Sequence, residues 1–211
     1  MMTHLISKYS WDNARAASHQ GYVFPEVMRM IERIDFRGQP KRVFDIGCGN
    51  GSVDARLTEL GYEVIGIEPS AEGVARAREA FPHLQIHQAS CYDDLAARFG
   101  QFPVVISLEV IEHVFLPREF CRCVYSLLQN EGSAIISTPY NGYWKNLAIS
   151  LVGGMDRHYN PLWDYGHIKF FSRRTFRQIL GEAGLRDIRF CRVGRVPPLA
   201  KSMIAIARKS V

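Results

Sequence analysis

Short apolar runs alternate with amphipathic stretches along most of the chain. Mostly apolar runs predict buried strands over residues 42–46, 63–67, 104–108 and 132–138, and a further strand is expected over 84–87. Apolar residues at helical spacing predict helices between them, among others over 52–60, 70–80 and 121–128. Strands that alternate with helices indicate a parallel, doubly wound α/β sheet, whose ligands bind at the carboxyl ends of the strands.

The two ends of the chain and one internal segment depart from this rhythm. Two helices are expected before the sheet, over 9–18 and 25–34, the second with Pro25 in its first turn. Residues 140–168 are rich in aromatic residues and histidine, which is typical of a lid or binding loop. Within them, 144–155 predict a helix that covers the substrate, covers the sheet edge or contacts a lipid surface. A helix over 172–183, capped by Ser172, and strands over 185–193 and 202–208 complete the chain.

Length and composition predict a single domain. The 211 residues are 47% hydrophobic, enough for one large core. We expect a helical cap (1–40), a cofactor-binding core (41–139), a substrate lid (140–168) and a C-terminal helix with a strand pair (169–211). A net charge of +5 without a run of basic residues argues against nucleic-acid binding. We see no signal peptide, no apolar run that approaches the ~20 residues of a membrane span, and no zinc-binding spacing among the five cysteines. A cytoplasmic protein is therefore expected. The sequence leaves its oligomeric state open.

A glycine turn follows the first predicted strand. Asp45 precedes Gly47, Gly49 and Gly51, which alternate with other residues, and a helix begins at Ser52. Glycine lets a ligand approach the backbone closely, and the helix N-terminus favours an anion, so the turn indicates a nucleotide-type site. Ser52 stands where the dinucleotide fingerprint has its third small residue, so that fingerprint fits imperfectly.

Ionisable side chains also follow two other predicted strands. Glu68 ends the second strand, 21 residues after Gly47, where a carboxylate can accept hydrogen bonds from both hydroxyls of a ribose. Glu109, Glu112 and His113 follow the central strand; if residues 109–114 are helical, these three side chains share one face. They are therefore a candidate site.

The chain resembles class I S-adenosylmethionine (SAM)-dependent methyltransferases, and within them the ubiquinone-biosynthesis O-methyltransferase group. The resemblance extends over about residues 9–209, but residues 141–163 depart from the pattern of the family. It rests on the motifs at 45–51, 68–70, 107–114, 137–139 and 166–171. It implies a Rossmann-like, doubly wound, seven-stranded sheet with an antiparallel last strand, N-terminal helices and an insertion after strand five as a lid.

The resemblance also implies which residues hold the cofactor. The glycine turn would cradle the methionine part of SAM, Glu68 the ribose, and the segment after the third strand the adenine. The residues implied are Asp45, Gly47, Cys48, Gly49, Gly51, Glu68, Pro69, Ser90, Cys91, Tyr92, Leu108 and Glu109. In the third-strand segment, Asp93 or Asp94 is equally expected to cap the next helix.

Methyl transfer to a hydroxyl needs a base near neutral pKa. The candidate catalytic residues are His113, His167 and Glu109, with His158 as a further histidine. The resemblance also allows a divalent metal on Glu109, Glu112 and His113, although the leading hypothesis includes no metal. We expect O-methylation of a small hydroxylated acceptor (a quinone precursor, phenol, sugar or natural product), with S-adenosylhomocysteine (SAH) as co-product. The alternatives are an N-methyltransferase and a SAM-binding module without turnover; a dehydrogenase fits less well.

Overall fold

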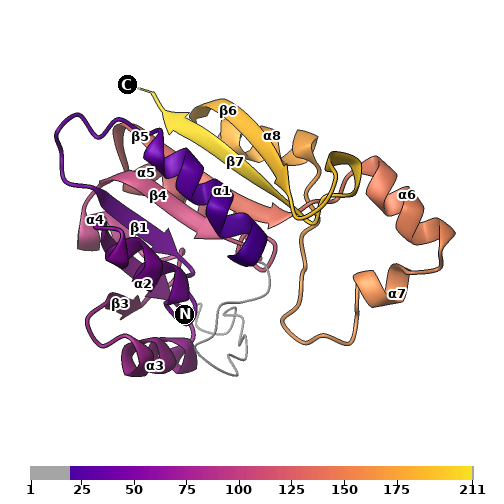
Figure 1. Cartoon of the computed structure of the whole chain (residues 1–211), viewed down its shortest axis with the longest axis horizontal. Helices are drawn as coiled ribbons and strands as arrows, with labels where there is room; N and C mark the ends of the chain where they lie inside the picture. Colours follow the sequence, from indigo (N-terminus) through magenta and orange to yellow (C-terminus); the bar gives the residue numbers. More distant parts are fainter. Residues whose placement is uncertain (1–19, 211) are drawn as a thin grey trace.

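Seven strands form one mixed sheet in the computed structural model, which describes residues 20–210. The strand order is β3-β2-β1-β4-β5-β7-β6, and β7 alone runs antiparallel to both neighbours (Figure 1). The strands are β1 (Arg42–Ile46), β2 (Glu63–Glu68), β3 (Gln85–Gln88), β4 (Phe102–Leu108), β5 (Leu128–Pro139), β6 (Leu185–Val193) and β7 (Ser202–Lys209). The predicted seven-stranded, doubly wound sheet with an antiparallel last strand is confirmed.

Helices cover both faces of the sheet. One face carries α1 (Gln20–Glu32), α2 (Ser52–Glu59) and α3 (Ala71–Ala80), and the other carries α4 (Leu95–Phe99), α5 (Pro117–Leu127) and α8 (Arg173–Glu182). Alternate residues of a strand point to opposite faces. Val104 and Ile106 of β4 therefore pack towards α1 and α2, and Val105 packs towards α5 and α8. This two-sided burial explains why the central strand reads as a continuous apolar run.

The start of α1 differs from the prediction. Residues 9–18 lie outside the described residues, and the helix expected over 25–34 already includes Gln20, so that Pro25 lies inside it rather than in its first turn. Val23 and Phe24, before the proline, and Val27 after it are all buried against the sheet. Packing of this continuous apolar stripe outweighs the local disadvantage of an internal proline.

Three of the expected helix caps are present. The Ser70 hydroxyl accepts a hydrogen bond from Gly73 N at the start of α3. Asp94, rather than Asp93, caps α4 by accepting from Ala97 N. Ser172 forms a reciprocal capping box with Thr175 at the start of α8. These side chains fix where the helices begin.

The segment between β5 and α8 extends beyond the carboxyl ends of the strands (Figure 1). The single helix expected over 144–155 is wrong: the chain forms α6 (Tyr143–Leu151) and α7 (Met155–His158), with a break at Gly153, whose φ is +64°. A left-handed residue cannot continue an α-helix. A 3-10 turn, η1 (Pro197–Leu199), packs near α6.

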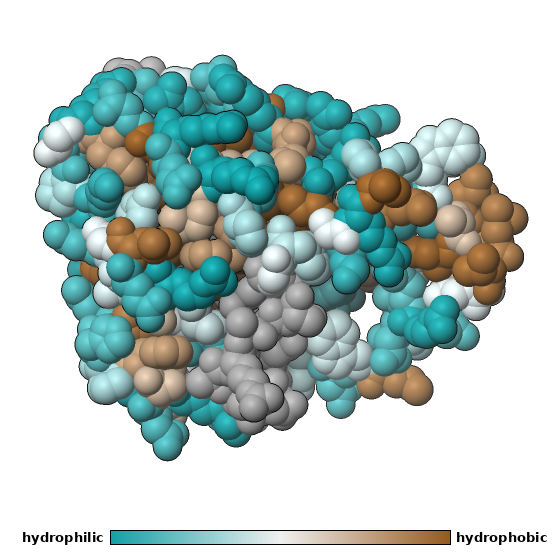
Figure 2. Space-filling view, in the orientation of Figure 1, coloured by the Kyte–Doolittle hydropathy of each residue, from teal (hydrophilic) through white to brown (hydrophobic). Residues whose placement is uncertain are grey.

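Apolar side chains gather on the outer surface of α6 (Figure 2). No side chain of α6 is buried, and Leu151 and Val152 are 78% and 76% exposed.

Within residues 20–210, no helix is long and apolar enough to cross a membrane. All five cysteines are free thiols.

Candidate functional site

A cavity of about 610 Å³ opens at the carboxyl edge of the sheet, between the strand ends and the segment that carries α6 and α7. It brings together ten of the candidate site residues: Asp45, Gly47, Cys48, Glu68, Pro69, Leu108, Glu109, His113, His158 and His167. The other predicted cofactor residues, Gly49, Gly51, Ser90, Cys91 and Tyr92, do not line it. The predicted residues thus fall into two groups, those that line the cavity and those outside its lining.

The glycine turn after β1 is tightly enclosed. Gly47, Gly49 and Gly51 all have positive φ. A Cβ on Gly47 would lie 2.6 Å from Val110 Cγ2, and one on Gly51 would lie 2.7 Å from Ile86 Cδ1. Both positions therefore require glycine, for backbone conformation and for space.

The amides of this turn are used within the protein, which the sequence did not reveal. Gly47 N and Cys48 N both donate to the carbonyl oxygen of Ile67, at 2.8 and 2.9 Å. Gly49 N donates to Glu68 Oε2 at 3.1 Å. The turn thus offers a ligand close approach rather than these three donors.

Glu68, at the end of β2, is held from two sides. Besides Gly49 N on Oε2, Ser70 N donates to Oε1 at 2.9 Å. Each carboxylate oxygen has two acceptor positions, so both oxygens keep one for a ligand. Burial raises the pKa of Glu68 to about 7, and the two backbone N–H groups oppose that rise. Glu68 can therefore accept hydrogen bonds from two adjacent hydroxyls.

A second carboxyl group lies beneath the turn. Asp54 of α2 and Asp45 of β1 are both buried, and a Cβ on Gly66 of β2 would lie 2.1 Å from Asp54 Oδ2. Burial raises the pKa of Asp45 to about 7 and that of Asp54 well above its usual range, where the charge of Asp45 adds to the effect. Two neighbouring buried carboxyls do not both ionise near neutral pH. The sequence analysis did not single out Asp54. The signal for it was an acidic residue at a core-facing position of a helix.

The segment after β4 is a turn, not the predicted helix. Glu109 has φ +57°, and its N–H group lies 3.0 Å from Ser137 Oγ and 3.3 Å from the Ser137 carbonyl oxygen. The shared helical face expected for Glu109, Glu112 and His113 is therefore wrong. Hydrogen bonds from the neighbouring strand β5 hold the turn, and the local pattern of residues could not show them.

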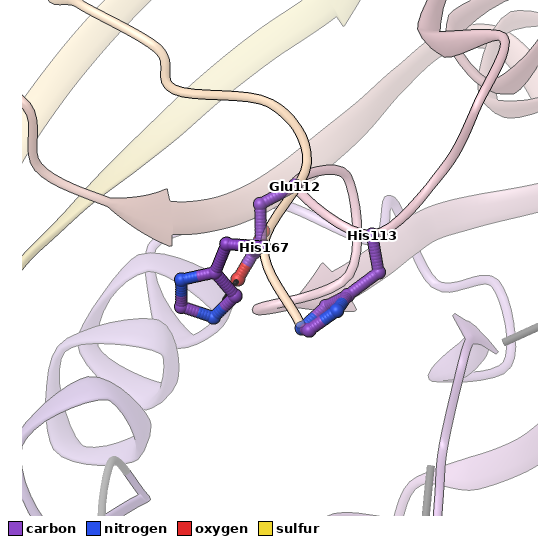
Figure 3. A group of neighbouring side chains, drawn as sticks. All are labelled: Glu112, His113 and His167. Atoms are coloured by element: carbon purple, nitrogen blue, oxygen red, sulfur yellow. Dashed lines mark ion pairs between the residues drawn. The ribbon is translucent and has the colours of Figure 1, made fainter. Parts of the chain in front are cut away.

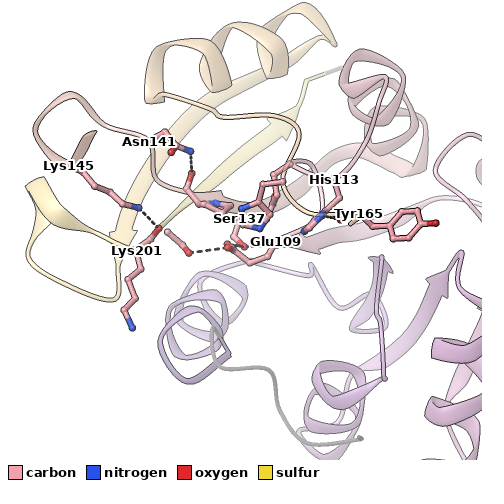
Figure 4. Close-up of polar contacts among 11 residues, drawn as sticks. Glu109, His113, Ser137, Asn141, Lys145, Tyr165 and Lys201 are labelled. Atoms are coloured by element: carbon pink, nitrogen blue, oxygen red, sulfur yellow. Dashed lines mark hydrogen bonds and ion pairs between the residues drawn. The ribbon is translucent and has the colours of Figure 1, made fainter. Parts of the chain in front are cut away.

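The Glu109 carboxyl group points into a set of hydroxyl donors (Figure 4). Ser137 Oγ donates to Glu109 Oε1 at 2.8 Å, and Ser202 Oγ donates to Oε2 at 3.1 Å. Burial raises the pKa of Glu109 to about 7, and the two hydroxyls and the charge of Lys145 oppose that rise. This carboxyl group can therefore exchange a proton near neutral pH.

The two candidate histidines lie together (Figure 3). Their ring centroids are 4.8 Å apart. His113 Nδ1 lies 3.1 Å from the carbonyl oxygen of Tyr165, which can only accept, so Nδ1 carries the proton in the neutral ring and Nε2 is basic. Burial lowers the pKa of His113; burial and the charge of His113 lower that of His167 to about 4. Both rings are neutral at pH 7, and His167 is the weaker base.

Glu112 completes this group and bears on the metal alternative. Its Oε1 is 4.0 Å from His167 Nε2, and candidate ligand atoms of Glu112, His113 and His167 lie within 4.8 Å of one another. Glu109, expected in this set, is instead held by the two serines. Burial and the charge of Glu109 raise the pKa of Glu112 well above its usual range. The spacing fits a cation, but Glu112 would first have to lose its proton.

The cavity also contains residues that the sequence analysis did not single out. Lys145 of α6, Arg195 and Lys201 bring positive charge to it, and Ser202 also lines it. A signal was present for Lys145, the only charged residue in the stretch that forms α6. Arg195 and Lys201 lie in the loop between β6 and β7, where nothing in the sequence marks them.

Known proteins resemble this chain in sequence and in fold. The family model described as "Methyltransferase domain" matches residues 18–189. A protein named ubiquinone biosynthesis O-methyltransferase from Ruegeria pomeroyi is 33% identical over 152 residues, 70% of this chain and 60% of that protein. Its namesake from Bradyrhizobium diazoefficiens is 35% identical over 115 residues, 53% of this chain and 45% of that protein. The chain thus matches about half the length of these curated relatives.

A solved structure supports the fold. The crystal structure of a SAM-dependent methyltransferase from Archaeoglobus fulgidus superposes with a TM-score of 0.65 at 17% identity, over 89% of this chain and 93% of that one. The family model covers most of the chain. The chain belongs to the family of SAM-dependent methyltransferase domains.

Proposed function

We propose that this methyltransferase domain transfers a methyl group to an oxygen of a small hydroxylated acceptor. The observation that carries the proposal is the cavity itself, which is lined by the glycine turn and Glu68 together with Glu109 and His113. The names of the relatives from Ruegeria pomeroyi and Bradyrhizobium diazoefficiens support an O-acceptor.

The described residues fit the cofactor. Gly47 and Gly51 leave the space that a Cβ would fill, and Glu68 keeps one acceptor position on each oxygen for the ribose hydroxyls. Asp45 and Cys48 would support the turn, and Leu108 would lie against the cofactor. Ser90, Cys91 and Tyr92 would hold the adenine beside the main cavity. Bound SAM supplies an electrophilic methyl group, so the protein has to orient the acceptor and accept its proton.

Glu109 and His113 are the residues we assign to that proton. Glu109 has a pKa of about 7, and His113 is neutral with its basic nitrogen set by the contact to Tyr165. His167, with a pKa of about 4, would orient His113 rather than act first as the base. Desolvation by Trp163 and Tyr159 of the lid would favour transfer to oxygen over loss to water.

Thermal unfolding with SAH, with NADH as the control ligand, tests the cofactor assignment. At about 100 times the dissociation constant, SAH should add about 2.7 kcal/mol and raise Tm by roughly 5–10 °C. Turnover of radiolabelled SAM with catechols, and with amines of similar size, then tests the acceptor atom. SAH binding with transfer only to amines would favour the N-methyltransferase alternative, and SAH binding without any transfer would favour a binding module.

The apolar surface of α6 supports a second role for the lid, peripheral contact with a lipid surface. Tyr143 and Trp144 are 73% and 64% exposed at one end of the helix, and Leu151 and Val152 are exposed at the other. Aromatic and aliphatic side chains of this kind insert at the headgroup boundary. The protein should co-sediment with anionic vesicles. The double variant Trp144→Ser with Leu151→Ser should stay in the supernatant.

A further inference from the structure

Lys145 places a half-buried positive charge in the cavity wall. Its Nζ donates to the carbonyl oxygens of Tyr140 at 2.8 Å and Lys201 at 3.4 Å, and its side chain reaches towards the strand ends that carry Glu109 (Figure 4). An ammonium group has three donors, so one remains for a ligand. Burial and the charge of Arg195 lower the pKa of Lys145 to about 8, which leaves most of it charged at pH 7.

Arg195 and Lys201 add positive charge to the same wall. Both line the cavity, and the charge of Arg195 acts on Lys145 and on Tyr22. The ammonium group of Lys201 lies 5.1 Å from the centre of the Tyr22 ring. The ion pairs found within residues 20–210 include none of these three cations.

No protein carboxylate in the described part neutralises this charge fully. Glu109 is the acid whose charge acts on Lys145, but it is hydrogen-bonded by two hydroxyls and its pKa of about 7 leaves it partly protonated. The charge of Lys145 extends instead to His158 and His167, whose pKa values it lowers. An anion in the cavity would relieve the repulsion between the charges of Lys145 and Arg195.

The position of Lys145 separates it from the glycine turn. It is anchored to Tyr140, just after β5, whereas the glycine turn follows β1, and β4 lies between these two strands in the sheet. Tyr159 bonds Asn146 beside Lys145, and Phe170 packs against Tyr159. With Trp163, which also lines the cavity, these are flat side chains that suit a planar ring. The cationic wall is therefore on the acceptor side of the cavity.

We propose that the acceptor is a hydroxylated aromatic acid whose carboxylate binds between Lys145 and Arg195. This inference rests on the proposed O-methyltransferase function and names its substrate class. The guanidinium group of Arg195 can form two parallel hydrogen bonds with a carboxylate, and Lys145 adds a third. The carboxylate fixes the ring so that a hydroxyl can face Glu109 and His113.

The test compares two probes of the same shape on the SAH-bound protein, 3,4-dihydroxybenzoate and the uncharged 3,4-dihydroxybenzamide. Isothermal titration calorimetry should show the acid binding at least about tenfold more tightly, since a hydrogen-bonded charge is worth that much. Arg195→Gln and Lys145→Met should each remove most of this preference. Lys41→Met, which loses one charge outside the cavity wall, is the matched control and should keep it.

Each other outcome has a defined meaning. Equal affinity for the two probes, or no binding of the acid, would overturn the proposal while intact SAH binding leaves the methyltransferase assignment standing. Weaker SAH binding by both cation variants would assign the pair to the carboxylate of the cofactor and also overturn it. Arg195 is exposed and its replacement should not unfold the protein, so this variant decides the test if Lys145→Met lowers Tm. Failure of the parent protein to bind SAH would refute the proposed function itself.

Discussion

Gly47→Ala measures how tightly the glycine turn packs against the segment after β4. A Cβ at residue 47 would lie 2.6 Å from Val110 Cγ2 and 3.1 Å from Cγ1, and the φ of +81° disfavours any side chain. A left-handed backbone costs about 1–2 kcal/mol per residue. Overpacking of a core typically costs about 1–3 kcal/mol. We therefore expect Gly47→Ala to lower the free energy of unfolding by about 2–5 kcal/mol.

Two further variants separate these contributions. Gly61 also has positive φ, +85°, but nothing lies within 4 Å of a Cβ built there, so Gly61→Ala should lose only the backbone part, about 1–2 kcal/mol. Val110→Ala removes the two atoms that a Cβ on residue 47 would meet. In that background, Gly47→Ala should lose about as little as Gly61→Ala does in the parent.

Urea unfolding of the four variants gives the free energies, and calorimetry gives the affinity for SAH. Gly47→Ala should also weaken SAH binding, because Gly47 lines the cavity, whereas Gly61→Ala should leave it unchanged. The reasoning is refuted if Gly47→Ala and Gly61→Ala lose the same free energy in the parent. It is also refuted if Val110→Ala does not reduce the loss caused by Gly47→Ala.

The other predictions concern single groups of the site. Glu68→Gln should weaken SAH binding about 10- to 100-fold, since a charged acceptor is worth about 1.5–3 kcal/mol; unchanged affinity in calorimetry would exclude Glu68 as the ribose ligand. Glu109 has a pKa raised from 4.5 to about 7 by burial, so it stabilises the fold at low pH and loses that contribution as pH rises through 7. In urea unfolding, Glu109→Gln should therefore gain about 1 kcal/mol relative to the parent between pH 6 and pH 8, and a constant difference would contradict this. His113→Ala should lower turnover of a hydroxyl acceptor about 10²- to 10⁴-fold without changing SAH affinity, and an unchanged rate would remove it as the base. EDTA should leave turnover unchanged; loss that Mg²⁺ restores would assign Glu112, His113 and His167 to a metal.

The sheet could be predicted because its signals are local and repeated. Each strand up to β5 except the short β3 contains an apolar run, and turns or helix caps such as Ser70 and Ser172 mark the boundaries of the helices. The carboxyl ends of parallel strands share one edge, so Gly47, Glu68 and Glu109 could be expected near each other before any coordinates were known. In the structure, all three line the same cavity.

Features that depend on contacts between distant segments could not be predicted. Residues 109–114 have the spacing of a helix, but Glu109 is held in a left-handed conformation by Ser137, 28 positions along the chain. The amides of the glycine turn could not be seen to face Ile67 and Glu68, because that contact needs the register between β1 and β2. Arg195 enters the cavity only through the turn between β6 and β7.

Burial decides which of the predicted bases suits the proposed chemistry. From the sequence, His113 and His167 are the expected bases, since histidine is the residue that ordinarily titrates near pH 7, and Glu109 is a further catalytic candidate. In the cavity, burial reverses that order: it raises the pKa of Glu109 to about 7 and, with neighbouring charge, lowers that of His167 to about 4. A carboxylate with a raised pKa accepts a proton more readily than an imidazole whose pKa is lowered so far. The same low polarity makes the uncompensated charge of Lys145 effective on an anionic acceptor, so one physical cause selects both the base and the substrate that we propose.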